Sequence, residues 1–204
     1  MTPEEQADSI LHQASGNKRY FVAVSGPPGS GKSTLCDTLE EYLGNKTTVS
    51  VVAMDGFHFD NAILKERNLF DRKGSPDTFD VTSLYLLLYN LKNQTEPLAV
   101  PVFDRENDLA RNCAKLVHPG DHIILVEGNY LLCKTEPWNK LHAIFDHTIS
   151  ISTSIKTLEK RLIQRWRDHK HTQEQAQKRV NYNDLPNARF VLENSITADT
   201  TIKN

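Results

Sequence analysis

The sequence predicts a three-layer α/β fold, in which a mostly parallel five-stranded sheet lies between helices on both faces. Two observations support this prediction. Short apolar segments alternate along the chain with segments of helical periodicity, which is the pattern of parallel strands joined by crossover helices. A glycine-rich loop at residues 26–33 also joins the first apolar segment directly to the first helical one.

The five expected strands are short runs of apolar and β-branched residues bounded by turn or polar residues. They lie at residues 20–25, 48–54, 98–103, 122–127 and about 145–152. Their apolar runs are continuous, as expected for strands that are covered on both faces.

The expected helices carry apolar stripes with spacings of three and four residues. The three stripes are Leu35, Leu39 and Leu43; Val81, Leu84, Tyr85 and Leu88; and Ile155, Leu158, Leu162 and Trp166. Gly44 is placed to end the first helix, and Asp80 is placed to cap the second.

Length and charge limit the organisation and the partners of the chain. Its 204 residues predict one domain over residues 1–204, with a mobile lid region at about 155–185. Lys and Arg total 24 and Asp and Glu total 26, so the net charge of −2 argues against nucleic-acid or membrane binding. Three scattered cysteines and an acidic N-terminal segment predict a cytoplasmic protein. The expected partner is a small-molecule substrate, and a homodimer stays open.

Residues 26–33 read Gly-Pro-Pro-Gly-Ser-Gly-Lys-Ser and match the phosphate-binding pattern G-x-x-x-x-G-K-[ST]. We therefore expect ATP and Mg²⁺ as ligands. The predicted nucleotide-binding residues are Gly26, Gly29, Ser30, Gly31, Lys32, Ser33 and Thr34. Lys32 is expected to reach the β- and γ-phosphates, and the Ser33 hydroxyl is expected to hold Mg²⁺. A glycine-rich turn with a chance lysine is the alternative interpretation.

Carboxylates follow three of the predicted strands, at Asp55, Asp104 and Glu127. Ligands of parallel α/β sheets bind beyond these strand ends. Phosphoryl transfer to an alcohol needs one carboxylate as proton acceptor and another beside the metal. We predict Asp55 as the base, with Gly56 leaving room for a substrate, and Glu127 as the metal-side residue. The structural alternatives are a turn or cap role for Asp55 and simple pairing of Asp104 with Arg105.

The predicted lid is strongly basic. Between residues 156 and 179, eight Lys and Arg residues outnumber three Asp and Glu residues. Arg161 and Arg165 are four residues apart on one helix face and are expected to neutralise the transferring phosphoryl group. A solvated, charged helix face is the alternative.

Together these motifs resemble the phosphoribulokinase/uridine kinase family of P-loop kinases, which includes bacterial pantothenate kinase. The matching blocks are residues 26–33, 54–58 (Met-Asp-Gly-Phe-His), 75–80 (Ser-Pro-Asp-Thr-Phe-Asp), 103–105 (Phe-Asp-Arg) and 126–128 (Val-Glu-Gly). Within this family, the sequence resembles the short bacterial sugar or fructose-transport kinases. The resemblance implies a base at Asp55, sugar-hydroxyl binding at Asp77, metal binding at Glu127, lid arginines at Arg161 and Arg165, and adenine proximity at Asn187. We add His58, Arg105 and Tyr130 as candidates for substrate binding.

The predicted function is ATP-dependent transfer of the γ-phosphate to a hydroxyl of a small metabolite, of the sugar or polyol type. The Asp55/Asp77 pair favours a neutral acceptor, because carboxylates repel anions. Uridine/cytidine and pantothenate kinase activities are alternatives, although Phe103 stands where uridine kinases carry tyrosine and residues 105–111 contain no histidine. A regulatory NTPase without an acceptor and a nucleoside monophosphate kinase are alternatives from other classes.

Overall fold

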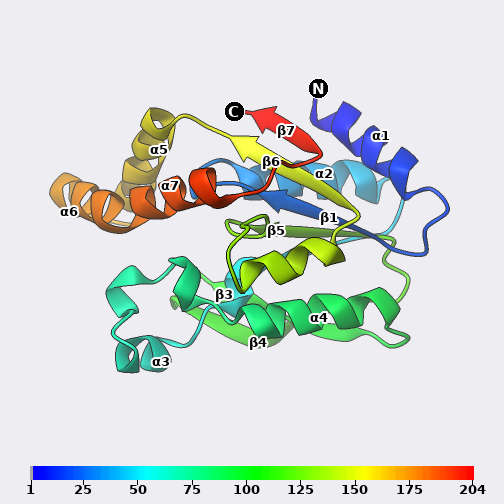
Figure 1. Cartoon of the computed structure of the whole chain (residues 1–204), viewed down its shortest axis with the longest axis horizontal. Coiled ribbons are helices and arrows are strands. Elements are labelled where there is room, and N and C mark those ends of the chain that lie inside the picture. Colours follow the sequence, from blue (N-terminus) through cyan, green and yellow to red (C-terminus); the bar gives the residue numbers. More distant parts are fainter. Residues whose placement is uncertain (1) are drawn as a thin grey trace.

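The computed structural model describes residues 2–204 and contains a five-stranded sheet in which all neighbouring strands are parallel (Figure 1). The strand order is β2–β5–β1–β6–β7. The strands are β1 (Tyr20–Ser25), β2 (Val49–Ala53), β5 (Ile123–Gly128), β6 (His147–Ser152) and β7 (Thr200–Lys203). In this register Glu127 lies level with Val24 of β1 and Ala53 of β2, so the ends of the three central strands meet.

One of the five predicted strands lies outside the main sheet. The segment 98–103 belongs to β3 (Leu98–Asp104), which pairs antiparallel with β4 (Leu109–Val117) in a separate two-stranded hairpin. Pro101 explains the difference, because it lacks the N–H that a central strand must donate, and the pairing register shifts between Val100 and Val102. The fifth strand of the main sheet is instead β7, which the sequence reading missed because its residues are mostly polar.

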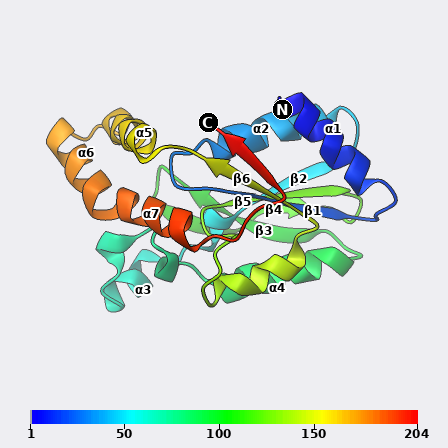
Figure 2. The same ribbon diagram turned by 45° about the horizontal axis from the view of Figure 1, so that its top comes forward.

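Helices cover both faces of the sheet (Figures 1 and 2). They are α1 (Pro3–Ala14), α2 (Lys32–Gly44), α3 (Asn61–Glu66), α4 (Val81–Asn93), α5 (Ile155–Asp168), α6 (Gln173–Arg179) and α7 (Leu185–Asn194). The helices predicted from the apolar stripes at residues 35–43, 81–88 and 155–166 are confirmed as α2, α4 and α5. The Asp80 carboxylate accepts a hydrogen bond from the Ser83 amide at 2.9 Å, as expected for the cap of α4. The predicted three-layer α/β fold is therefore confirmed.

Alternate side chains of the central strands enter two separate cores. Val22 and Val24 of β1 pack with α1 and α2, for example with Leu39. Phe21 and Ala23 pack on the other face with α4 and the 3₁₀ helix Trp138–Ile144. Every residue of β1 is buried, which explains its continuous apolar run.

The predicted lid region contains α5, α6, a π-helix at Val180–Asp184 and the start of α7, which lie together beyond one end of the sheet (Figures 1 and 2). It has its own small core, made of Leu158, Leu162, Val180, Leu185 and Ala188. No helix among residues 2–204 is long and apolar enough to cross a membrane.

Burial of the cysteines predicts how they react. Cys113 is exposed, whereas Cys36 and Cys133 are buried, and burial raises the pKa of Cys133 to about 11. Because the thiolate is the reactive form, we expect one fast-reacting thiol per native chain at pH 8 and three after denaturation. Titration with a chromogenic disulfide checks this count. The Cys113→Ser variant should lose the fast phase, and two fast thiols in the native protein would contradict the burial.

Candidate functional site

The phosphate-binding loop lies between β1 and α2, and its glycines are required by local backbone geometry and by two neighbours. Gly29 and Gly31 have φ angles of +78° and +96°, a region that residues with a Cβ rarely adopt. A Cβ on Gly29 would lie 3.1 Å from Cγ of Leu162, and one on Gly31 would lie 2.7 Å from Nδ2 of Asn204. The loop therefore packs directly against α5 on one side and against the end of β7 on another.

Lys32, the first residue of α2, lies half-buried at the base of this loop. Its ammonium donates to the Pro27 carbonyl at 3.1 Å. Burial lowers the pKa of Lys32 to about 8, and the nearby carboxylates of Asp55 and Glu127 oppose that shift. A desolvated ammonium with few partners is suited to bind phosphate oxygens.

Glu127 near the end of β5 has the environment expected of a metal-side carboxylate. Burial raises its pKa, the Ser33 hydroxyl opposes this shift, and the negative charge of Asp55 adds to it. The Oε2 atom is buried and has no hydrogen-bond partner among residues 2–204. A carboxylate and a hydroxyl are oxygen donors of the kind that Mg²⁺ prefers. These residues therefore fit Mg²⁺, with further ligands supplied by phosphate and water; the described residues contain no cluster of three His, Cys, Asp or Glu that could hold a metal alone.

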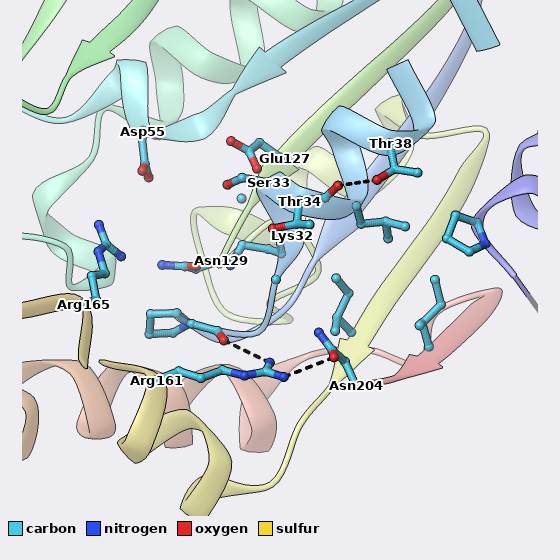
Figure 3. Close-up of a pocket in the computed structure, with 18 of the residues that line it drawn as sticks. Lys32, Ser33, Thr34, Thr38, Asp55, Glu127, Asn129, Arg161, Arg165 and Asn204 are labelled. Carbon is cyan, nitrogen blue, oxygen red and sulfur yellow. Dashed lines mark hydrogen bonds between the residues drawn. The ribbon is translucent and has the colours of Figure 1, made fainter. Parts of the chain in front are cut away.

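Asp55 follows β2 in a short 3₁₀ turn, Met54–Phe57. Its Oδ2 lies 3.4 Å from Nη2 of Arg105, which comes from the turn after β3. Figure 3 shows Asp55 and Arg165 facing one another across the open part of the site, with Glu127 and Ser33 between the phosphate loop and Asp55. The Asp55 turn, β5, the turn after β3 and α5 thus bring a carboxylate, a metal-side group and two guanidiniums to one place.

One pocket of about 670 Å³ contains most of the predicted residues. Those that line it are Gly29, Gly31, Lys32, Ser33, Thr34, Asp55, Arg105, Glu127, Arg161 and Arg165. Gly26 and Ser30 belong to the same loop but do not line the pocket. Ser30 is fully buried, and a Cβ on Gly26 would lie 2.9 Å from Oγ of Ser30.

The two lid arginines have different environments. Arg161 donates to the Gly29 carbonyl at 3.4 Å and to Oδ1 of Asn204 at 3.2 Å (Figure 3). Arg165 instead points toward Asp55, and partial burial and then the positive charge of Arg105 lower its pKa. The indole of Trp166 donates to Asp184 at 2.6 Å and so ties α5 to the π-helix. The lid in this conformation already rests on the phosphate loop.

Comparison with known proteins identifies the family. The model of the phosphoribulokinase/uridine kinase family matches residues 21–197. The chain belongs to this family. It is 33% identical to the Escherichia coli K12 protein YggC, itself uncharacterized, over 96% of this chain and 82% of YggC. It is also 33% identical to the pantothenate kinase of Lactococcus lactis strain IL1403, over 72% of this chain and about half (49%) of that enzyme.

A crystal structure of a "putative fructose transport system kinase" from Silicibacter sp. TM1040 is 40% identical to this chain. The two superpose with a TM-score of 0.94 over 99% of each chain. The protein is therefore a kinase with the P-loop fold of its family, and the resemblance deduced from the motifs is confirmed.

Two of the predicted residues of this kinase lie in another hollow. Asp77 and Asn187 line a second pocket of about 430 Å³, together with Arg72 and Trp138, and neither lines the pocket of the phosphate loop. Arg72 holds Asn187 by a hydrogen bond of 3.4 Å to its Oδ1 and also donates to the Tyr182 carbonyl. The expectation that Asp55 and Asp77 face one acceptor is not met in this conformation.

Tyr130 and His58 serve as supports in the kinase structure. Tyr130 is fully buried, and its hydroxyl donates to the Gly74 carbonyl at 2.6 Å. The prediction that it binds substrate is wrong for this conformation, because none of its surface is free. The ring of His58 packs at a tilt against that of Phe79, with the two centroids 4.0 Å apart, and its Nδ1 lies 2.8 Å from the Asp55 carbonyl oxygen. The His58 ring therefore holds the turn of the proposed base.

Gly56 has a different role from the one expected. A Cβ here would lie 2.6 Å from the Pro101 carbonyl oxygen, so the position is needed by the β3–β4 hairpin rather than by a substrate. Gly128 similarly leaves room for Met54, because a Cβ on Gly128 would lie 2.6 Å from Cβ of Met54. These close contacts fix the Asp55 turn between β5 and the hairpin.

We expect Gly56→Ala to destabilise the kinase by about 1–3 kcal/mol, because the Pro101 backbone must move. At about 2–4 °C per kcal/mol for a chain of this size, thermal unfolding should shift accordingly. Gly44→Ala is the matched control, since nothing lies within 4 Å of its added Cβ. Equal melting temperatures of the two variants would show that the contact does not constrain the turn.

Sequence reasoning missed Asn204. Its Nδ2 donates to the Ser30 carbonyl at 2.7 Å while its Oδ1 accepts from Arg161, so one amide joins the phosphate loop to the lid. The peptide N–H of Asn204 donates to Ser152, which extends the β6–β7 pairing and sets this position. No motif or apolar pattern surrounds it, so the sequence gives no signal for the contact.

Proposed function

We propose that this kinase transfers the γ-phosphate of ATP to a hydroxyl group of a small metabolite of the sugar or sugar-like polyol type. The main support is that Asp55 lines the same pocket as Lys32, Ser33 and Glu127, with its carboxylate turned to open space (Figure 3). Only an acceptor with a proton to lose needs such a carboxylate beside the phosphates.

In the proposed reaction the acceptor oxygen attacks the γ-phosphorus and forms the new P–O bond. The bond between that phosphorus and the β–γ bridging oxygen breaks, and ADP leaves with the electron pair. Asp55 accepts the hydroxyl proton. Lys32 and the loop amides bind the phosphate oxygens, and Arg165 faces the negative charge on the phosphoryl group that is transferred.

Mg²⁺ would be held by Ser33 and Glu127 together with phosphate oxygens. When bound, it supplies charge neutralisation of the triphosphate. The burial of Glu127 Oε2 without a partner supports this assignment, because an ionised carboxylate is costly to bury unpaired.

The sugar-type acceptor is supported by the sequence identity of 40% to the Silicibacter protein, which is named as a fructose transport system kinase. A pantothenate-type acceptor has the support of the Lactococcus relative, which aligns over a smaller share of both chains. Both compounds carry free hydroxyl groups, so the proposed role of Asp55 is the same for either acceptor.

The test is an ADP-release assay of the purified protein with MgATP, run with and without sugars, polyols, nucleosides and pantothenate. Saturable stimulation by a hydroxyl compound, with a phosphorylated product seen by mass spectrometry, is the expected result. ATP hydrolysis that no acceptor stimulates would contradict the proposal and favour a regulatory NTPase.

A further inference from the structure

Arg105 has no evident role toward the nucleotide. The phosphate-binding groups come from the loop and α2, and the lid arginines come from α5. Arg105 comes from the β3–β4 hairpin, on the side of the pocket where the hairpin backs the Asp55 turn at Gly56. It therefore lies with the proposed base on the acceptor side.

The pair between Arg105 and Asp55 is weak enough to be exchanged for a ligand. The shortest distance is 3.4 Å, and the side chains are 51% and 33% exposed. Exposed ion pairs of this kind contribute only about 0–1 kcal/mol. An incoming anion can therefore take over the guanidinium and leave the carboxylate free for a hydroxyl proton.

The pocket around Asp55 has an excess of positive charge, which also favours an anionic ligand. Among residues 2–204, five basic side chains line the pocket (Lys32, Arg105, Arg161, Arg165 and Lys203), against two acidic ones (Asp55 and Glu127). A net of +3 exceeds the charge of about −2 that MgATP brings. Arg105 and Arg165 carry like charges in one pocket and so repel one another; burial, and then the charge of Arg105, lower the pKa of Arg165. An anionic group between them would remove this repulsion.

We infer that the acceptor carries an anionic group, a carboxylate or a phosphate ester, which Arg105 binds beside Arg165 while a hydroxyl of the same molecule faces Asp55. The substrate class is then a hydroxy acid or a phosphorylated polyol rather than a neutral sugar. The expectation of a neutral acceptor depended on Asp77 facing the same ligand, and Asp77 lies in the second pocket. The inference rests on the proposed kinase function.

The test compares acceptors that differ in charge. Four matched pairs are used in the ADP-release assay: glycerol and glycerate, sorbitol and gluconate, pantothenol and pantothenate, and fructose and fructose 6-phosphate. For the pair that fits the pocket, we expect kcat/KM of the charged member to exceed that of the neutral member by about 10- to 100-fold, as for a charged hydrogen bond. The first three pairs report a carboxylate and the fourth reports a phosphate ester.

Variants of the hairpin separate substrate recognition from catalysis. Arg105→Gln should raise KM for the charged acceptor by about 10- to 100-fold with a smaller effect on kcat, and should largely remove the preference over its neutral partner. Arg105→Lys should restore part of it, because the charge remains but the planar fork is lost. Arg111→Gln is the control: it removes the same charge from the same hairpin, but Arg111 pairs with Asp104 at 3.4 Å outside the pocket.

Each other outcome has a distinct meaning. Equal or better turnover of the neutral members would overturn the inference and leave the proposed function standing. An equal loss of kcat for charged and neutral acceptors in Arg105→Gln would also overturn it, because Arg105 would then act on the transferring phosphoryl group. Stimulation by none of the compounds would overturn the proposed function itself.

Discussion

Asp55→Asn should lower kcat by about 10²- to 10⁴-fold while the affinity for MgATP changes only a few-fold. The amide keeps the shape of the side chain but cannot accept the hydroxyl proton. The contact with Arg105 is weak and exposed, so its loss should not unfold the turn. The turn is instead held by the contacts of Gly56 and Gly128 with their neighbours.

Two measurements check this prediction. Acceptor-dependent ADP release gives kcat, and quenching or calorimetric titration with MgATP gives the affinity. Asp71→Asn is the matched control, since Asp71 is an exposed aspartate that does not line the pocket. If Asp55→Asn kept full turnover with an acceptor, Asp55 would not be the base, although the P-loop kinase assignment would remain.

Local patterns predicted the parts of the fold that depend on neighbours in sequence. Four of the five predicted strands lie in the main sheet, and the apolar stripes of α2, α4 and α5 and the Asp80 cap of α4 were correctly placed. The failures concern pairing. β7 is short and polar, and it becomes a strand because the edge of β6 offers it partners. The segment 98–103 is apolar, but Pro101 keeps it out of the central sheet.

The candidate site divides in the same way. The phosphate loop, Asp55 and Glu127 follow strand ends that the parallel sheet must bring together, so their convergence could be predicted from sequence. Asp77, Asn187 and Tyr130 lie on segments whose direction depends on packing between the loop at residues 70–75 and the lid. Tyr130 illustrates this, because its hydroxyl donates a hydrogen bond to the Gly74 carbonyl and is not free to bind a substrate.

The same distinction applies to the lid, where Arg161 and Arg165 are equivalent in sequence but not in structure. Arg161 is bound to the Gly29 carbonyl and to Asn204, so it braces the phosphate loop against α5. Arg165 lies one helical turn further along and faces Asp55 across the site (Figure 3). In the proposed reaction, a guanidinium at Arg165 would meet the charge that develops during transfer, whereas one at Arg161 would meet the bound nucleotide in ground and transition states alike.

Arg165→Ala should therefore lower kcat by about 10²- to 10³-fold with a small change in KM for ATP, as for the loss of one preorganised transition-state donor. Arg161→Ala should chiefly raise KM for ATP, by about 10-fold, because it removes a contact of the loop. Arg167→Ala is the control, being an exposed arginine of α5 outside the pocket. Steady-state kinetics with varied ATP separate the two effects. Loss of kcat of similar size in both variants would mean that the lid moves further than this conformation shows and brings both arginines to the phosphoryl group.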